Sequence, residues 1–478
     1  MDSTLVKKDL YVNGKWVEAK SYKDLYAPYS QEVLAEVPEA SEEEVDQAVQ
    51  SAKRASTKLR KMPAHERAYI LENIAKLMED RSEEAAQIIA KEAAKPIQTA
   101  RGEVARTIQT YKFAAEEAKR IGGETISLDA APGGENRMAY TVREPIGVVA
   151  AITPFNFPMN LVAHKVGPAI AAGNPVVLKP AEQTPLSSFF LAELAEEAGL
   201  PAGGLNVVTG EGSIVGEALV TDGRINAVTF TGSPEVGTGI RNKAGLKKVT
   251  LELGSNSGVI VDEGVDLDKV VPRAVQGAFA YQGQVCISLQ RIYVHEQIYD
   301  AFVEKFLEET KKLVIGDPLS EDTNVSSMIS KKDVERSIDW LREAVEDGAE
   351  IAYGGVAEGT TLHPTVVKNA GLHTKVSCQE VFAPIVSINK VSSVEEGIKC
   401  LNHSKYGLQA GVYTNDIHKG LDAVDALEVG GVLINDIPTF RVDHMPYGGV
   451  KQSGTGREGL KYAVEEMTEM KLVILNRN

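Results

Sequence analysis

GVVAAITPFNFP, residues 147–158, is the stretch that decides the fold class. It begins as a short apolar run, typical of a strand that is buried on both faces. Similar apolar or β-branched runs follow it, namely PVVLKP, LNVVTG, NAVTF and KVTLEL. Most of them are separated by helix-like segments such as LSSFFLAELAEEAG. Strands that alternate with helices predict a parallel sheet with crossover connections, and therefore an α/β fold.

A second α/β series runs from about residue 255 to 445. Its expected strands are RIYVH, PTVV, APIVSINKV, AGVYT and GGVLIN, and its expected helices cover 298–313 and 331–347. A chain of 478 residues is too long for one hydrophobic core. We therefore expect two Rossmann-like α/β domains.

The segments outside these two series are different in character. YVNGKWV predicts a hairpin that turns at Asn13-Gly14. Ser41 and Glu44 form a capping-box pattern, which opens a helical stretch to about residue 120 with breaks near Pro63 and Pro96. Residues 126–145 look like an excursion of one or two strands. The tail EEMTEMKLVILN predicts a helix turn followed by an exposed strand.

Composition and charge exclude several classes of protein. The chain has 43% hydrophobic and 25% charged residues, as ordinary globular proteins do. Its net charge of −16 disfavours nucleic acid and anionic membranes as partners. No apolar run approaches about 20 residues, and the N-terminus lacks the apolar segment of a signal peptide. Three cysteines without disulfide or metal spacing fit a reducing cytoplasm.

Two glycine-containing loops follow expected strands. GEGSIVG at 210–216 resembles a dinucleotide fingerprint with one extra residue before the last glycine. In TGSPEVG at 231–237, Gly232 and Ser233 would begin a helix whose N–H groups can meet a phosphate. A P-loop is rejected because Thr238-Gly239 stands where that motif has Lys-Ser/Thr. The alternative is that both loops are plain turns.

Lys179 and Glu182, in KPAEQTP, lie just beyond a strand end. A lysine and a carboxylate there can bind the two hydroxyls of a ribose, and the carboxylate would repel a 2′-phosphate. This favours NAD over NADP, with NADP still possible. The alternative is an ordinary surface ion pair.

Three residues suggest covalent catalysis. Cys286 has small neighbours in YQGQVCIS, and a thiolate is a strong nucleophile. Glu252 lies at a strand end, where a partly desolvated carboxylate can act as a general base. Asn156, held between Pro154 and Pro158, can donate to a developing oxyanion. Each has a plain alternative as packing, surface or turn residue, and none of the eight histidines lies in a cysteine-hydrolase motif.

Taken in order, TPFNFP, KPAEQTP, FTGSPEVG, LELGS, GQVC, QEVFAPI and PYGGVKQSGTGREG resemble the aldehyde dehydrogenase superfamily over nearly the whole chain. The resemblance is closest to the lactaldehyde, non-phosphorylating glyceraldehyde-3-phosphate and succinate-semialdehyde dehydrogenase-like branch. It implies an NAD(P)-dependent, metal-free oxidation of an aldehyde to a carboxylic acid. Cys286 would form a thiohemiacetal and then a thioester, Asn156 and the Cys286 N–H would bind the oxyanion, and Glu252 would activate the hydrolytic water.

The same resemblance implies the cofactor-binding residues. They are Ile152, Thr153, Pro154, Phe155, Lys179, Glu182, Gly212, Gly216, Phe230, Gly232, Ser233, Val236, Leu253, Gly254, Glu380 and Phe382. Ser255 in LELGS departs from the usual LELGG and puts the local cofactor or water geometry in question.

The resemblance also bears on the substrate, for which a short hydroxyaldehyde or anionic aldehyde is expected. NDIPTFRVDHMPYGG at 435–449 would line the substrate mouth, where Arg441 and His444 could meet an anionic group. Alternatively, Arg441 pairs with Asp443 or with a neighbouring subunit. Val285 stands where triose-phosphate enzymes tend to have arginine, which weakens a phosphate substrate. The rival functions are a CoA-acylating semialdehyde dehydrogenase and a non-catalytic binding protein.

The expected domains follow from these segments. Residues 1–122 and 146–254 would bind the cofactor, and residues 255–445 would carry the nucleophile. Residues 123–145 and 465–478 would form an oligomerisation element, because an exposed strand edge needs a partner. A homodimer or homotetramer is the expected assembly.

Overall fold

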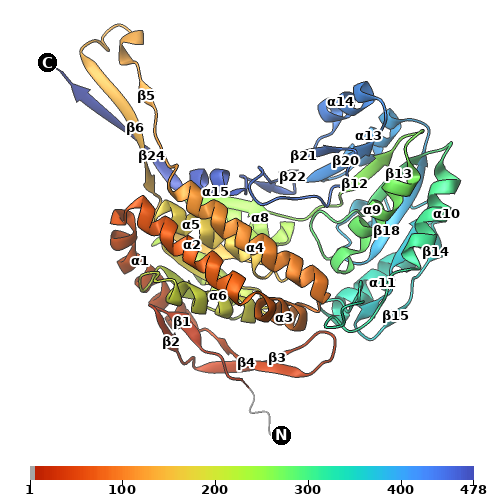
Figure 1. The fold of residues 1–478 in the computed structure, drawn as a ribbon, viewed down its shortest axis with the longest axis horizontal. Helices are drawn as coiled ribbons and strands as arrows, with labels where there is room; N and C mark the ends of the chain where they lie inside the picture. Colours follow the sequence, from red (N-terminus) through yellow and green to blue (C-terminus); the bar gives the residue numbers. More distant parts are fainter. Residues whose placement is uncertain (1–5, 478) are drawn as a thin grey trace.

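The computed structural model describes residues 6–477, which contain two large sheets and a projecting arm (Figure 1). The first sheet has eight strands, in the order β2 (Lys15–Val17), β1 (Leu10–Val12), β9 (Leu205–Val207), β8 (Val176–Lys179), β7 (Val148–Ile152), β10 (Ile225–Thr231), β11 (Lys248–Glu252) and β23 (Gly454–Thr455). The strands from β9 to β11 are parallel, as predicted. The edge strands β1, β2 and β23 are antiparallel to their neighbours.

Helices cover both faces of the first sheet. Successive side chains of a strand point to opposite faces, so each strand contributes to two cores. Along β7, Val149 and Ala151 pack into one core, whereas Val148, Ala150 and Ile152 pack into the other. The first core includes α2 (Ala64–Asp80), α3 (Ser82–Ala93), α4 (Ile97–Ala118), α5 (Asn160–Ala172), α6 (Leu186–Glu197) and α15 (Leu460–Glu466). The second core includes α1 (Glu42–Lys61), α7 (Glu217–Thr221) and α8 (Pro234–Lys243).

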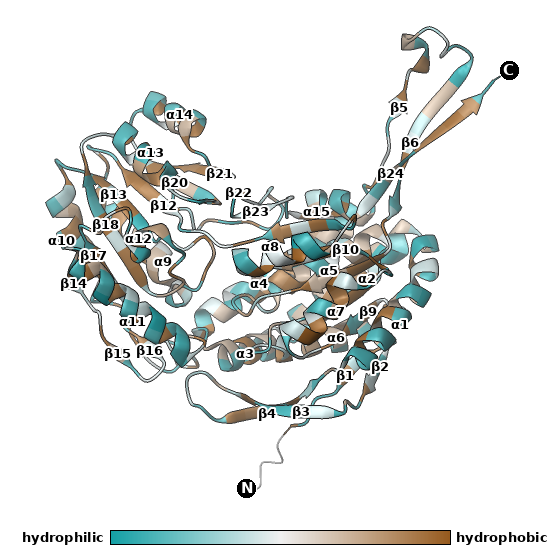
Figure 2. Ribbon diagram, turned by 180° about the vertical axis from the view of Figure 1, so that it is seen from behind, coloured by the Kyte–Doolittle hydropathy of each residue, from teal (hydrophilic) through white to brown (hydrophobic). Residues whose placement is uncertain are grey.

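The second sheet has seven strands, in the order β14 (Glu350–Tyr353), β17 (Thr365–Lys368), β18 (Ile385–Val391), β13 (Arg291–His295), β12 (Gly258–Val261), β20 (Gln409–Tyr413) and β21 (Gly431–Ile434). All neighbours are parallel except β14 and β17. The central strands of this sheet carry buried apolar residues, for example Val259 in β12, Ile292 in β13 and Val412 in β20, and the sheet can be followed in Figure 2. The covering helices are α9 (Leu267–Phe279), α10 (Tyr299–Thr310), α11 (Lys331–Glu346), α13 (Val394–Asn402) and α14 (Ile417–Ala426).

A three-stranded arm projects from the body (Figure 1). It consists of β5 (Thr125–Ile126), β6 (Arg137–Pro145) and β24 (Thr468–Asn476). β6 and β24 pair along their whole length, so the chain's last strand lies beside a segment more than 300 residues earlier. The side chains of Met470, Leu472 and Ile474 are about half exposed, and the arrow of β24 is coloured largely as hydrophobic in Figure 2.

Several local predictions are confirmed. Asn13 and Gly14 both have positive φ in the turn between β1 and β2. The Ser41 N–H donates to the Glu44 carboxylate at 2.7 Å, as the capping box requires. Helices end before Pro63 and Pro96. No helix among residues 6–477 is both long and apolar enough to span a membrane.

One helix boundary was not predicted. α2 and α3 meet at Arg81, whose backbone is not helical although no proline or glycine is present. The Arg81 guanidinium pairs with Glu84 and Glu193 and lies over the Phe190 ring at 4.5 Å. These tertiary contacts, which helix propensity does not include, offer a reason for the break.

The remaining short elements form turns and small ladders. They are β3 (Ser21–Tyr26), β4 (Val33–Glu39), η1 (Leu128–Ala130), η2 (Gly212–Gly216), η3 (Ala280–Gly283), β15 (Ala357–Glu358), β16 (Thr361–Leu362), α12 (Lys375–Cys378), β19 (Tyr406–Gly407) and β22 (Val450–Lys451). Of these, η2 and η3 border the site described next.

Candidate active site

A cavity of about 750 Å³ lies where the carboxyl ends of β7, β8, β10 and β11 face residues of the second sheet's domain. Open α/β sheets bind ligands at such strand ends. Cys286, Glu252 and Asn156 all line this cavity. So does every residue that the sequence suggested for the cofactor, namely Ile152, Thr153, Pro154, Phe155, Lys179, Glu182, Gly212, Gly216, Phe230, Gly232, Ser233, Val236, Leu253, Gly254, Glu380 and Phe382.

Cys286 lies on the loop between η3 and β13. Its Sγ is 2.9 Å from the Tyr447 hydroxyl. Burial raises the pKa of the thiol to about 11, although the Tyr447 hydrogen bond and the charge of Arg441 act in the opposite direction. The loop approaches the second sheet closely, since a Cβ on Gly283 would lie 2.1 Å from the Ala383 carbonyl oxygen. Burial therefore favours the protonated thiol, and the loop that carries it is closely packed.

Asn156 and Glu252 line the same cavity as Cys286 and have unused hydrogen-bonding capacity. The Asn156 Nδ2 donates to the Gln284 carbonyl at 3.1 Å, and its Oδ1 has no partner. Neither carboxylate oxygen of Glu252 has a partner, although the residue is only 3% exposed. Burial and the negative charge of Glu458 raise the pKa of Glu252 well above its ordinary range. Buried polar atoms without partners are unusual, and they suggest that a ligand or water completes the site.

Lys179 and Glu182 lie at one end of the cavity. The Glu182 carboxylate accepts from the Gly212 N–H at 3.2 Å and pairs with Lys23 at 3.2 Å. Lys23, on β3, also pairs with Glu39 at 3.0 Å. Burial lowers the pKa of Lys179 to about 8, against the effect of Glu182. The sequence missed Lys23 because it lies more than 150 residues from Glu182.

The N-terminus of α8 lies farther along the cavity. Ser233 caps the helix, accepting from the Val236 N–H at 3.4 Å. A Cβ on Gly232 would lie 2.4 Å from the Phe230 ring, so glycine keeps the backbone accessible there. The N-terminus of this ten-residue helix carries the positive end of the helix dipole, which suits a phosphate.

The segment at 380–382 closes the cavity on the opposite side. The Glu380 carboxylate accepts from the Ser255 N–H at 2.9 Å, and burial raises its pKa to about 7. Phe382 meets Phe155 edge-on, with ring centroids 5.8 Å apart. The Ser255 hydroxyl instead contacts that of Ser257 at 2.9 Å, so the extra side chain is accommodated locally. The size, the carboxylates and the helix N-terminus together fit a nicotinamide dinucleotide.

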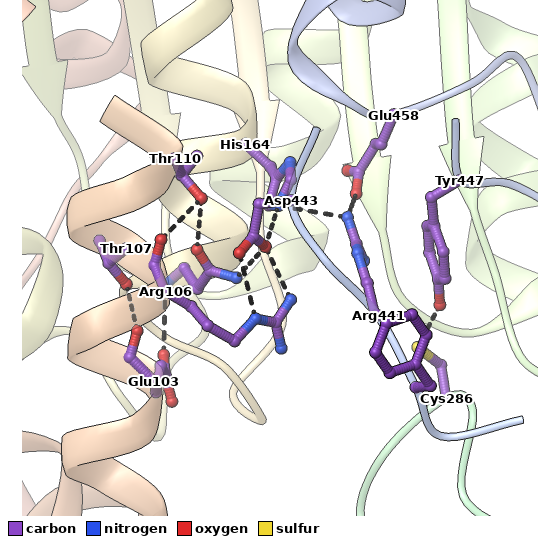
Figure 3. A network of polar contacts seen from close by, with 12 residues as sticks. Glu103, Arg106, Thr107, Thr110, His164, Cys286, Arg441, Asp443, Tyr447 and Glu458 are labelled. Carbon is purple, nitrogen blue, oxygen red and sulfur yellow. Dashed lines mark hydrogen bonds and ion pairs between the residues drawn. The ribbon is translucent and has the colours of Figure 1, made fainter. Parts of the chain in front are cut away.

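On the other side of Cys286 lies a set of polar side chains, buried except for the partly exposed Arg106, which we call the arginine network: Arg106, His164, Arg441, Asp443 and Glu458 (Figure 3). Arg441 pairs with Glu458 at 3.0 Å and lies over the Tyr447 ring at 3.6 Å. Its Nε is buried without a partner. Burial opposes its charge, but Glu458, Tyr447 and Asp443 raise the pKa of Arg441.

Asp443 is the second anion of the network. It accepts from Arg106 at 2.7 Å and Asn160 at 3.0 Å, and it contacts His164 at 2.9 Å. Burial opposes its charge, but His164 and Arg106 lower the pKa of Asp443 well below its ordinary range. The alternative that Arg441 pairs with Asp443 is therefore wrong, since Glu458 is the partner of Arg441.

The two predicted substrate residues are placed differently. Arg441 lies close to Cys286 (Figure 3). His444 is exposed and packs against Phe113, with ring centroids 4.8 Å apart. Sequence reasoning missed Arg106, His164 and Tyr447. Tyr447 lies in a quoted motif, but nothing in the sequence indicates its contact with Cys286.

Comparison with known proteins gives consistent matches over nearly the full length. A sequence profile described as the Aldehyde dehydrogenase family matches residues 16–473. A 3-sulfolactaldehyde dehydrogenase of Priestia aryabhattai is 51% identical over 98% of both chains. Aldehyde dehydrogenase 21 from Physcomitrella patens, solved with its reaction product succinate, has a TM-score of 0.97 at 41% identity, over 99% of each chain. The GapN glyceraldehyde-3-phosphate dehydrogenase of Methanocaldococcus jannaschii, complexed with NADP, has a TM-score of 0.92 at 41% identity, over 96% of this chain and 100% of that one.

Proposed function

The chain belongs to the aldehyde dehydrogenase family, and from that premise we propose that it oxidises a short hydroxyaldehyde that carries an anionic group. It is an aldehyde dehydrogenase that uses a nicotinamide cofactor. The proposed reaction converts the aldehyde to a carboxylic acid and transfers a hydride to the cofactor. The relative that acts on 3-sulfolactaldehyde supports a hydroxyaldehyde with a sulfonate or similar group.

The first chemical role belongs to Cys286. The thiol must lose its proton before Sγ attacks the aldehyde carbon, and Tyr447 and Arg441 both lower its pKa. The new oxyanion would accept from the Asn156 Nδ2 and the Cys286 N–H. For this, the Asn156 amide has to leave the Gln284 carbonyl. Removing one such donor from an enzyme costs about 10²–10³-fold in kcat.

Glu380 and Phe382 would hold the nicotinamide end of the cofactor, which when bound would supply a hydride acceptor for the substrate carbon. A thioester on Cys286 would remain and has to be hydrolysed. Glu252 is suited to take a proton from the attacking water, because both of its oxygens lack partners. Its raised pKa makes it a stronger base once ionised, and Glu458 contributes to that shift. Glu252 therefore favours hydrolysis over transfer of the acyl group to CoA.

Arg441 carries the proposal for an anionic substrate. Its guanidinium lies over the Tyr447 ring, and the hydroxyl of that ring contacts the Cys286 sulfur. The unpaired Arg441 Nε is a buried donor that an anionic group could use. The Arg106 guanidinium, whose side chain is 32% exposed, adds positive charge on the far side of Asp443. His444 supports this less, because it packs on Phe113.

For the cofactor we propose a preference for NAD. A 2′-phosphate beside the Glu182 carboxylate would be repelled. Lys23 reduces this repulsion, but it is shared between Glu182 and Glu39. NADP therefore remains an admissible cofactor, as in the M. jannaschii relative.

We propose the domain boundaries and the oligomeric assembly that the sequence suggested. Residues 1–122 and 146–254 would form the cofactor domain, residues 255–445 the catalytic domain, and residues 123–145 and 465–478 the oligomerisation element. The half-exposed apolar side chains of β24 support pairing of the arm with a second copy, in a homodimer or homotetramer.

The test measures the formation of reduced cofactor by absorbance, in parallel reactions with NAD and with NADP. The aldehydes are 3-sulfolactaldehyde, lactaldehyde, succinate semialdehyde, glyceraldehyde 3-phosphate and benzaldehyde, each with and without CoA. We expect NAD-linked activity that is highest on an anionic hydroxyaldehyde and independent of CoA. Highest activity on benzaldehyde would refute the anionic substrate, and a requirement for CoA would favour the acylating alternative.

A further inference from the structure

The loops that carry Cys286 and Asn156 share an anchor far from either in sequence. We call it the α3–α4 corner, residues 93–95. The Ala93 carbonyl accepts from the Tyr281 hydroxyl at 2.9 Å, and the Ala94 carbonyl accepts from the Gln282 Nε2 at 3.0 Å. Lys95 donates from Nζ to the Asn156 carbonyl at 2.6 Å. The corner therefore binds the nucleophile loop on one side and the Asn156 loop on the other.

Backbone geometry at these contacts is unusual. Ala94, Tyr281 and Gln282 all have positive φ, between 47° and 54°. Residues with a Cβ rarely adopt this region, and they keep it only where the surrounding contacts enforce it. The side-chain hydrogen bonds of Tyr281 and Gln282 to the corner are such contacts. The shape of the nucleophile loop thus depends on the corner.

Lys95 is completely buried between the two loops. Its ammonium lies 3.8 Å from the centroid of the Phe157 ring and 4.3 Å from that of the Tyr281 ring. Phe157 adjoins Asn156, and Tyr281 belongs to the nucleophile loop. The cation is therefore in contact with both loops at once, through a hydrogen bond and two aromatic faces.

Glu103, on α4, is the counter-ion of Lys95 and is also buried. One of its oxygens accepts from the Lys95 ammonium. The other accepts from the N–H groups of Met159 at 3.0 Å and Asn160 at 3.2 Å, where α5 begins. Lys95 thus holds the Asn156 end of the segment 156–160, and Glu103 holds its other end.

We infer that Lys95 and Glu103 form a positioning pair that sets where the Asn156 amide stands relative to Cys286. Lys95 fixes the Asn156 carbonyl while the Asn156 side chain turns from Gln284 toward the substrate oxygen. Neither Lys95 nor Glu103 lines the cavity, so neither is a catalytic residue. This inference rests on the proposed role of Asn156 as oxyanion donor.

Stability alone is a weak reason for this pair. Replacing a buried ion pair by apolar groups of similar volume is often neutral or stabilising, whereas removing one partner is costly. The informative variant is therefore the double substitution Lys95→Met/Glu103→Gln, which leaves no unpaired charge. We expect kcat to fall about 10²-fold, as misplacement by about 1 Å can cause. The KM for the aldehyde and the affinity for NAD, measured by fluorescence titration, should stay within about threefold of wild type.

A double-mutant cycle with Asn156→Ala separates positioning from a general structural role. If the pair acts through Asn156, the double substitution should lower kcat much less in the Asn156→Ala background than in wild type. The matched control is Glu92→Gln. Like Glu103, Glu92 is a buried carboxylate, and it lies on α3. It accepts from the Leu186 and Ser187 N–H groups at 2.8 and 3.0 Å, and not from the segment 156–160. Its substitution should leave kcat unchanged.

The outcomes distinguish the two proposals. Wild-type kcat in the double variant, or an equal loss in both backgrounds, would overturn the positioning role while Asn156→Ala still loses activity. Full activity in Asn156→Ala would overturn the oxyanion role and the positioning role together. If the double variant does not fold, Glu103→Gln alone, which keeps the shape of the side chain, enters the same cycle.

Discussion

Buried polar groups on the two sides of Cys286 differ in how fully they are paired. On the cofactor side, both oxygens of Glu252, the Oδ1 of Asn156 and the hydroxyl of Thr153 have no partner. In the arginine network, Asp443 has three partners, and Glu458 pairs with both Lys165 and Arg441. The polar atoms on the cofactor side thus lack hydrogen-bond partners within the protein, whereas most of those in the arginine network have them.

This difference separates two uses of buried polarity. A buried group without a partner lowers stability by about 1–3 kcal/mol, so it persists where a bound molecule completes it. A buried charge that is paired within the protein is stabilised by its partners, and it contributes to the site through its position and its electrostatic field. Two atoms of the network, the Arg441 Nε and the His164 Nδ1, are also buried without a partner and in this resemble the cofactor side. Substitutions on the cofactor side should therefore affect activity, and those in the network should affect stability as well.

Cys286→Ser should give the largest effect. A serine hydroxyl at the same place is a much poorer nucleophile, and loss of a covalent nucleophile costs about 10⁴-fold or more in kcat. Formation of reduced cofactor should fall to near the background rate while thermal stability is retained. Substantial turnover in this variant would mean that the reaction does not pass through Cys286.

Glu252→Gln should lower kcat by about 10²–10⁴-fold, as expected for loss of a general base. Because the Glu252 carboxylate has no partner, the unfolding temperature should not fall and can rise. If hydrolysis is the step affected, mixing with NAD and aldehyde should give a burst of reduced cofactor close to one equivalent per Cys286, followed by slow turnover. Steady-state turnover at the wild-type rate would contradict the role of Glu252 as general base. A clear loss of stability would contradict the contrast between the unpaired cofactor side and the paired network.

Asp443→Asn tests the paired side. Removing this charge leaves Arg106 and Arg441 less compensated, and breaking such a buried pair typically lowers the free energy of unfolding by about 3 kcal/mol. The pKa of Asp443 is lowered in the folded state, so its contribution is present above about pH 4 and is lost as pH falls further. The difference between variant and wild type in urea unfolding should therefore be largest near neutral pH and shrink in acid. Equal stability of Asp443→Asn and wild type at neutral pH would show that the hydrogen bonds and ion pairs of Asp443 do not stabilise the fold.

Glu182→Gln should change cofactor choice rather than stability. Without the carboxylate, the repulsion of a 2′-phosphate is removed and Lys23 becomes available to it. We expect kcat/KM for NADP relative to NAD to rise about tenfold, or about 1.4 kcal/mol. An unchanged ratio of kcat/KM for NADP to that for NAD would show that Glu182 does not discriminate between the two cofactors.

Tyr447→Phe should give the smallest effect. The Tyr447 hydroxyl lowers the pKa of the Cys286 thiol, so its removal moves that pKa upward from about 11. Alkylation of Cys286 by iodoacetamide, followed across the alkaline range, should be slower at each pH below the pKa, by less than about tenfold. A faster reaction would contradict the assigned direction of this hydrogen bond.

The sequence predicted the features that depend on neighbouring residues. The parallel strands of the first sheet, most strands of the second sheet, the turn at Asn13-Gly14 and the suggested catalytic and cofactor residues all lie in short contiguous motifs, whereas β12, β14 and β23 were not predicted. Arg106 could not be found this way, because on the helix α4 it has the pattern of a solvated charge. It reaches the site only because Asp443 is brought beside it from 337 positions away. Lys95 was missed for the same reason, since a lysine next to Pro96 gives no sign of complete burial.

The pairing of β6 with β24 has a consequence for how the protein is made. The arm joins residues 137–145 to residues 468–476, and β23 at 454–455 completes the edge of the first sheet beside β11. During synthesis, β6 therefore emerges more than 300 residues before β24, and the edge of β11 about 200 residues before β23. An unpaired strand edge is a template for aggregation, and distant pairing slows folding. Translation speed and chaperones that cover nascent strands should consequently affect the yield of active enzyme more than its final stability would suggest.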